Sequence, residues 1–182
     1  MIIAVVLLSA VVFSLPASAG PIDTGSWLQF RFEGPGSLGG ACSDITCAAS
    51  SAGNSVFLDT PAWTFNLSTN VELKVTDAYL SGDTFRVYDF GSLILTTGSF
   101  LNYAPWAISD PDKCFGTDFF SYGFIALPSG NHSLTIESVD SPYGSGTAYF
   151  RIDRIVSTPE PLSLILLGLG LMGLGIAAGK RT

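Results

Sequence analysis

The chain has 182 residues and a formal net charge of −7 at pH 7. Apart from its two apolar ends, it is long enough for one hydrophobic core and too short for two. The acidic excess repels phosphate backbones, so we expect no nucleic-acid partner.

The apolar start of the chain predicts export. Residues 1–19 hold an apolar run at 2–13, then a helix-breaking proline, and end in a small-x-small motif formed by Ala17 and Ala19 before Gly20. This order is typical of a cleaved secretory signal peptide. We expect the general secretion machinery to export the chain and the mature protein to begin at Gly20. An uncleaved N-terminal anchor is the alternative.

The segment 20–158 is expected to form one domain with a β pattern throughout. Alternation of apolar and polar residues, with a period of two, predicts strands at 27–32, 71–75, 85–88, 132–136 and 148–152. Further strands are expected at 56–58, 63–67, 93–97 and 119–127. Turns rich in Gly, Ser and Asn separate them, without a convincing amphipathic helix between. The expected fold is all-β, a two-sheet antiparallel sandwich that is jelly-roll-like, with a closed barrel as the alternative.

Three cysteines remain after removal of the predicted signal peptide. Cys42 and Cys47 are close together in a Gly/Ala/Ser-rich loop, so we predict a disulfide between them in an oxidising compartment. Cys114 would then be the free thiol. It is also the alternative partner for either of the other two.

An aromatic pair outside the strand pattern is the candidate for contact with carbohydrate. Tyr103 and Trp106 lie in a loop without strand alternation. Aromatic rings can stack on sugar rings, whereas aromatic residues at strand positions usually belong to the core. The loop is therefore a better candidate than the aromatic residues of the strands.

The loop before Cys114 holds the single cofactor candidate. Asp110 and Asp112 lie two apart across a proline, and loop carboxylates suit a hard cation. The main interpretation is that these are solvated turn aspartates and that no cofactor is present. A calcium ion on Asp110 and Asp112, with Asp83 or Asp118 as additional ligands, is the alternative.

The catalytic motifs that we considered are incomplete. His132 is the single histidine and follows a Gly-Asn turn, with no Gly-x-Ser-x-Gly motif in the chain. We interpret it as a turn residue whose ring bonds a neighbouring loop. The stretch 89–91 reads Asp-Phe-Gly but lacks the other kinase motifs, so a hairpin turn explains it better. We therefore expect a protein that is not an enzyme and that has no transition-metal site.

The end of the chain predicts a membrane anchor behind a stiff linker. Pro159 and Pro161 hold the backbone extended and present Glu160 between them. Residues 162–179 contain no ionisable side chain. As a helix, at about 1.5 Å per residue, they would span roughly 27 Å, close to the hydrocarbon thickness of a bilayer.

Two basic residues follow the apolar stretch. Lys180 and Arg181 are expected to stay on the cytoplasmic side of the inner membrane as a stop. The domain 20–158 would then face outward.

This tail, residues 159–182, resembles the PEP-CTERM sorting signal of Gram-negative bacteria that make extracellular polysaccharide. Pro159, Glu160 and Pro161 match its tripeptide, and Lys180-Arg181 match its basic end. The resemblance implies that an exosortase, a membrane-embedded cysteine peptidase, recognises the motif, removes the span and passes the protein to the cell surface or matrix. A tail anchor that is never cut is the alternative.

A second, less specific resemblance covers part of the domain. The stretches 77–85, 130–136 and 146–151 are similar to ectodomains that often accompany this tail. That resemblance implies a sandwich and no particular activity.

The leading hypothesis is an exported, non-enzymatic cell-surface or extracellular-matrix protein that an exosortase sorts and cleaves. Contact with exopolysaccharide through Tyr103 and Trp106 is its more specific form. A secreted hydrolase on a β-sandwich scaffold and a permanently membrane-anchored surface protein are the alternatives.

Overall fold

The computed structural model describes residues 25–43, 45–104 and 106–155. The predicted signal peptide with its cleavage site at Gly20, and the predicted sorting signal with its span at 159–182, lie outside the described residues. Within the described part, no helix has both the length and the apolar composition needed to cross a membrane.

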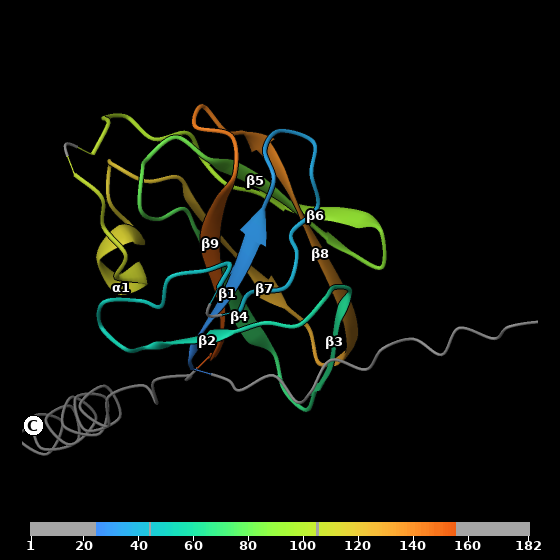
Figure 1. Cartoon of the computed structure of the whole chain (residues 1–182). Coiled ribbons are helices and arrows are strands. Elements are labelled where there is room, and N and C mark those ends of the chain that lie inside the picture. The colour runs from blue at the N-terminus through green and yellow to red at the C-terminus, as the bar shows by residue number, and fades with distance from the viewer. Residues whose placement is uncertain (1–24, 44, 105, 156–182) are drawn as a thin grey trace, which may run out of the picture.

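Nine strands and one helical turn make up the described chain (Figure 1). The strands are β1 (Trp27–Phe32), β2 (Ser55–Phe57), β3 (Trp63–Leu67), β4 (Val71–Thr76), β5 (Thr84–Asp89), β6 (Ser92–Thr96), β7 (Tyr122–Leu127), β8 (Gly130–Asp140) and β9 (Gly146–Arg154), and the helical turn is α1 (Pro111–Cys114). One sheet has the order β2-β1-β9-β4-β7 and the other β3-β8-β5-β6. All pairings are antiparallel except that of β1 with β2.

The all-β prediction is confirmed, in two separate sheets rather than one closed barrel. The predicted strand 27–32 matches β1 at both ends. The largest difference is β8, which is eleven residues long although alternation predicted only 132–136. It is long because its first half pairs with β3 and its second half with β5.

A single hydrophobic core lies between the sheets. Phe30 from β1 packs against Trp63 and Phe85 of the opposite sheet, with ring centroids 5.8 and 5.7 Å apart. Trp63 in turn lies 5.3 Å from the ring of Phe150 on β9. All four side chains are fully buried. The fold is therefore sandwich-like, with each sheet turning alternate side chains inward.

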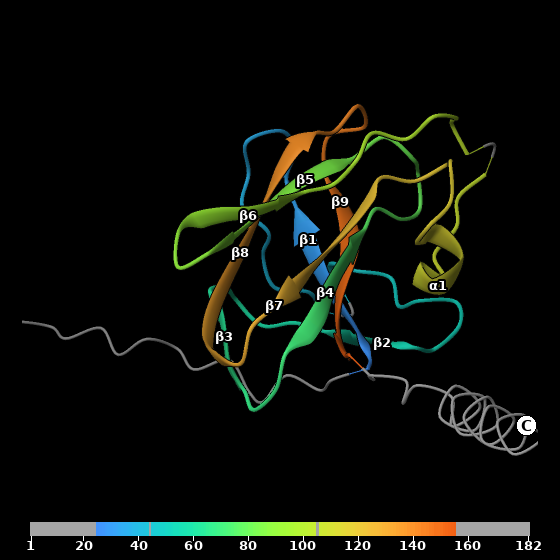
Figure 2. The same cartoon turned by 180° about the vertical axis from the view of Figure 1, so that it is seen from behind.

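A second apolar cluster covers the outer face of the five-stranded sheet. Its fully or nearly fully buried members include Trp27 on β1, Tyr149 on β9, and Cys114 and Phe120 from the segment between β6 and β7. That segment carries α1, which lies on the side of the molecule away from β6 in both views (Figures 1 and 2). The adjacent strands β1 and β9 are thus buried on both faces over much of their length.

Asp112 fastens α1 to this sheet. Its Oδ1 accepts hydrogen bonds from Trp27 Nε1 at 2.8 Å and Arg151 Nη1 at 2.9 Å, and its Oδ2 accepts one from Asn54 Nδ2 at 2.7 Å. The Arg151 guanidinium also lies 4.4 Å from the centroid of the Trp27 ring. Burial by itself would raise the pKa of the Asp112 carboxyl, but these hydrogen bonds and the positive charge of Arg151 hold the pKa below its usual value.

Replacement of this anchor should lower stability. We expect Asp112→Ala to reduce the free energy of unfolding by about 1 kcal/mol at pH 7, because a partly exposed carboxylate loses three charge-assisted bonds. Since the pKa of Asp112 is lower in the folded state, its contribution is complete above the usual value of 3.8 and is lost as the pH falls below it. Urea unfolding measures the difference, with the exposed Asp118→Ala as control. A variant as stable as the wild type at pH 7 would contradict the anchoring role.

Candidate functional site

A cleft of about 480 Å³ beside the disulfide is the candidate site. Its walls come from the end of β1, the β4–β5 turn, the β8–β9 turn and the loop that follows β1; residues that line it include Arg31, Glu33, Tyr79, Asp83, Tyr143 and Thr147. Its volume lies within the range of ordinary small-molecule sites.

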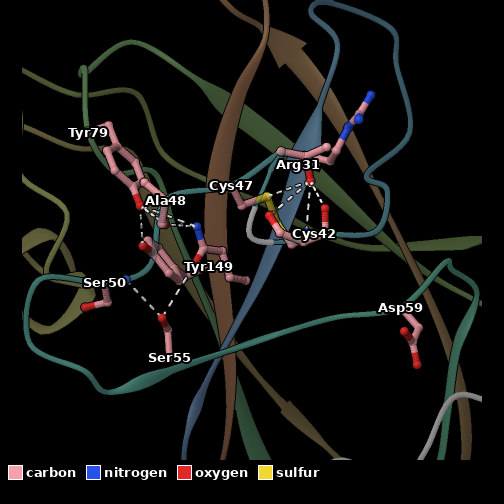
Figure 3. The surroundings of a disulfide bond; sticks show 12 residues. Arg31, Cys42, Cys47, Ala48, Ser50, Ser55, Asp59, Tyr79 and Tyr149 are labelled. Carbon is pink, nitrogen blue, oxygen red and sulfur yellow. Dashed lines mark hydrogen bonds between the residues drawn. A yellow bond between two sulfur atoms is a disulfide. The ribbon is translucent and has the colours of Figure 1, made fainter.

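The disulfide restrains one wall of this cleft. Cys42 and Cys47 are bonded, with their Cα atoms 5.5 Å apart, so the predicted pairing is confirmed. The loop that they close presents Thr46 to the cleft, and Ala48, directly after Cys47, also lines it. Just before this loop, Gly40 pairs with Arg31 on β1 through two backbone hydrogen bonds. The wall is therefore held both covalently and by the sheet (Figure 3).

A buried carboxylate shapes the β4–β5 turn on the other wall. Asp77 is fully buried, and its side chain accepts hydrogen bonds from the backbone N–H groups of Ala78, Gly82 and Asp83 at 2.7, 3.0 and 3.2 Å. Burial, helped by the nearby charge of Asp83, raises the pKa of Asp77, and the three N–H donors oppose this rise. These bonds fix the path of residues 77–83.

Tyr79 joins the turn to the disulfide-bonded loop. It adopts φ +66°, a left-handed conformation that costs a non-glycine residue of order 1 kcal/mol and persists only where its surroundings impose it. Its backbone pairs with Ile108 in both directions, and its hydroxyl donates to the carbonyl of Ala48. Its ring stacks on Tyr149, as Figure 3 shows. The two walls of the cleft therefore hold each other in place.

Asp83 lines the same cleft with a buried carboxyl group. The residue is only 6% exposed, and its Oδ1 is shielded from solvent and has no hydrogen-bond partner among the described residues. Chiefly because of this burial, the pKa of Asp83 rises to about 6. An unpaired buried acceptor reduces stability, and a perturbed carboxyl in a cleft is a functional candidate.

The rim of the cleft combines a charged pair with exposed apolar side chains. Arg31 and Glu33 form an ion pair on the β1 side. Leu80 and Tyr143 are exposed to 46% and 58% and both line the cleft. The site thus offers an apolar surface, hydroxyl groups and an unmet acceptor, which suits a ligand with both an apolar face and hydrogen-bond donors.

The predicted carbohydrate contacts lie outside this cleft. Tyr103 and Trp106 are both exposed, to 62% and 65%. The Tyr103 ring packs edge-on against Phe100 at 4.7 Å, and both line a shallower groove together with Pro142. Trp106 does not line that groove. Since Pro142 lines the groove and the next residue, Tyr143, lines the cleft, both are bordered by the β8–β9 turn.

The calcium candidates lie in α1 rather than in an irregular loop. Asp110 caps this helical turn by accepting a bond from the Asp112 backbone N–H at 3.2 Å, and Asp112 is the anchor described above. Of the proposed additional ligands, Asp83 lines the cleft. Over 25–43, 45–104 and 106–155, no three His, Cys, Asp or Glu side chains are grouped as a metal site would need. The calcium alternative stays a prediction.

His132 occupies a structural position. Its Nδ1 lies 2.8 Å from Asp89 Oδ2 and its Nε2 lies 3.0 Å from the carbonyl of Pro128, while its ring stacks on Phe65. The ring thus bonds neighbouring segments, as predicted, but His132 itself lies in β8 rather than in a turn. The β5–β6 hairpin turns at Phe90, with φ +46°, and Gly91, with φ +77°, which confirms the hairpin interpretation of 89–91.

Cys114 is the free cysteine, and it is fully buried. Burial raises the pKa of its thiol to about 12, with the charges of Asp77 and Asp110 adding to the rise. Since the thiolate is the reactive form, this thiol is inert in the folded protein.

The sequence did not indicate Asp77, Arg31 or Glu33 as site residues, and it suggested Asp83 only as a calcium ligand. The available signal was two aspartates that bracket a Ser-Gly turn, in which a short polar side chain can bond the backbone. The disulfide-bonded loop reaches the β4–β5 turn through a contact between residues distant in sequence, and no local sequence pattern indicates such a contact.

No family model, no curated protein and no solved structure matches the chain. The site must therefore be judged on its own geometry.

The raised pKa of Asp83 predicts that its ionised carboxylate lowers the free energy of unfolding at neutral pH. Its folded pKa of about 6 exceeds the usual 3.8, so the folded state binds more protons between these values and stability falls as the pH rises through them. We expect Asp83→Asn to raise the free energy of unfolding by about 1 kcal/mol at pH 7.5, discounted for partial solvent screening.

Urea unfolding of both proteins at pH 7.5 and pH 4 measures this effect. The difference in the free energy of unfolding between Asp83→Asn and the wild type should be smaller at pH 4 than at pH 7.5. The control Asp118→Asn should show no such change. A gap that widens toward pH 4, or a variant less stable than the wild type at pH 7.5, would contradict the burial argument.

Proposed function

We propose that this chain is an exported, non-enzymatic cell-surface or extracellular-matrix protein of a Gram-negative bacterium, sorted by an exosortase. The order of Pro159, Glu160 and Pro161, an uncharged stretch of bilayer length and the basic pair Lys180-Arg181 carries the proposal. The disulfide between Cys42 and Cys47 is compatible with it, since such bonds persist in oxidising compartments.

The proposed fold of the exported domain is a jelly roll. Without the short parallel strand β2, the two sheets have the orders β1-β9-β4-β7 and β3-β8-β5-β6, in which strands distant in sequence alternate as in two interleaved Greek keys. This order supports the assignment. Such a fold supports many unrelated functions, so it assigns no activity.

The surroundings of the histidine and of the free cysteine support a role that is not enzymatic. Both ring nitrogens of His132 face oxygen acceptors, and the Cys114 thiol is buried. Neither is placed to act as a base or nucleophile on a ligand.

A secreted hydrolase is the second candidate, and one observation favours it. The pKa of about 6 for Asp83 suits a general acid. A glycoside hydrolase of the usual kind needs a second carboxyl group across the substrate, and Glu33, the other carboxylate lining the cleft, is ion-paired with Arg31. Because Glu33 is engaged by Arg31 rather than free to act as the second catalytic carboxyl group, this ion pair favours a binding role for the cleft over a catalytic one.

Binding of exopolysaccharide is the more specific form of the proposal. The exposed rings of Tyr103 and Trp106 support it as candidate contacts, because aromatic faces stack on sugar rings. Neutral or weakly charged polysaccharide fits best, given the net charge of −7.

Intact-mass measurement of the protein from its native host tests the sorting proposal. We expect a mature species that begins at Gly20 and lacks the span 162–179, and a heavier species in a strain without exosortase. Replacement of Pro159, Glu160 and Pro161 by alanine should give the same heavier species, because the peptidase loses its recognition motif.

The control for this test is Glu33→Ala, which leaves the tail intact and should be processed normally. An identical, unprocessed mass in the wild type and the exosortase-deficient strain would contradict cleavage. It would favour the permanently anchored alternative.

A further inference from the structure

We propose that the cleft beside the disulfide, rather than the Tyr103–Trp106 loop, binds a neutral sugar unit, with Asp83 accepting a hydroxyl hydrogen bond and Tyr143 packing on the sugar ring. The inference rests on the proposed function in one respect, namely that the protein resides among polysaccharide. It goes beyond that function by naming the binding site and the charge of the ligand.

The unmet acceptor on Asp83 is the first argument. Its Oδ1 has no hydrogen-bond partner among the described residues, and the residue is more than nine-tenths buried. Buried acceptors are almost always paired, and leaving one unpaired is costly. A donor from a bound ligand would remove this cost. Asp83 lines the cleft, so a small adjustment of the cleft wall would bring a ligand hydroxyl group within reach of this oxygen.

The mixed lining of the cleft is the second argument. Tyr143 and Leu80 provide exposed apolar surface, while Thr147 and the Arg31–Glu33 pair provide hydrogen-bonding groups within the same cleft. A pyranose ring has this mixed character, with an apolar face of C–H groups and a rim of hydroxyl groups. Tyrosine suits such a ligand because it combines an apolar ring with a polar tip.

Charge selects a neutral sugar over an acidic one. The side chains that line the cleft include one cation, Arg31, and two carboxyl groups, Glu33 and Asp83. Glu33 already neutralises Arg31 through their ion pair, so the charge left over is negative, on a protein with a net charge of −7. A uronate or sulfated sugar would be repelled.

The walls are pre-organised for binding. Asp77 fixes the turn that ends at Asp83, and the Tyr79 hydroxyl ties this turn to Ala48. The loop that carries Ala48 is in turn restrained by Cys42 and Cys47. A site that forms before the ligand arrives avoids the entropic cost of ordering loops on binding.

Affinity electrophoresis of the full chain in detergent micelles tests the proposal. The probes are four neutral polysaccharides (a mixed-linkage β-glucan, xyloglucan, galactomannan and the neutral exopolysaccharide of the host) and the acidic polygalacturonate. We expect at least one neutral probe to retard the wild type and polygalacturonate to leave it unretarded.

The variants locate the site. We expect Asp83→Asn and Tyr143→Ala each to weaken retardation about tenfold, because the first replaces a charged acceptor with a neutral amide and the second removes one stacking contact. Trp106→Ala tests the competing Tyr103–Trp106 loop. The matched control is Phe90→Ala, an exposed aromatic that lines neither the cleft nor the Tyr103 groove, and it should bind like the wild type. Unfolding midpoints of all variants show whether any loss comes from misfolding.

Each result supports or overturns the inference. Full binding by Asp83→Asn and Tyr143→Ala with loss in Trp106→Ala overturns the cleft and leaves the exopolysaccharide-binding function standing. Retardation by polygalacturonate overturns the stated charge selectivity. Absence of retardation by every neutral probe overturns the cleft inference, while the sorting function is decided separately by the mass of the mature protein.

Discussion

The carboxylate of Asp77 is the constraint on which the candidate site depends. It is fully buried directly after β4 and accepts three backbone hydrogen bonds from the turn that follows this strand. Without it, these N–H groups would be left unpaired away from water, at a cost of about 1–3 kcal/mol each. The turn would then have no reason to hold Tyr79 at a positive φ or to place Asp83 in the cleft.

Two restraints from segments distant in sequence meet through this turn. The Cys42–Cys47 disulfide restrains the loop after β1, and Tyr79 reaches across from the β4–β5 turn to the carbonyl of Ala48 at the end of that loop. Gln29 on β1 donates to the same carbonyl at 2.7 Å. The cleft between them therefore has two fixed walls. The buried Asp83 Oδ1, which has no hydrogen-bond partner among the described residues, lowers stability locally, and the surrounding structure tolerates this.

The sequence predicted those features that depend on short-range patterns. Alternation located β1 and most of the core strands, the short spacing of Cys42 and Cys47 indicated their pairing, and the Asp-Phe-Gly turn was correctly interpreted as a hairpin. The length of β8 could not be predicted, because it is set by pairing with two different strands. For the same reason the cleft could not be predicted, since it forms where four segments distant in sequence converge.

A ¹³C NMR titration of the side-chain carboxyl carbon of Asp83 tests most directly the claim that this group is buried in the wall of a pre-organised cleft. The account predicts a transition near pH 6 in the folded protein. A transition near the usual value of 3.8 would mean that the carboxyl is solvated or paired, and would contradict the account.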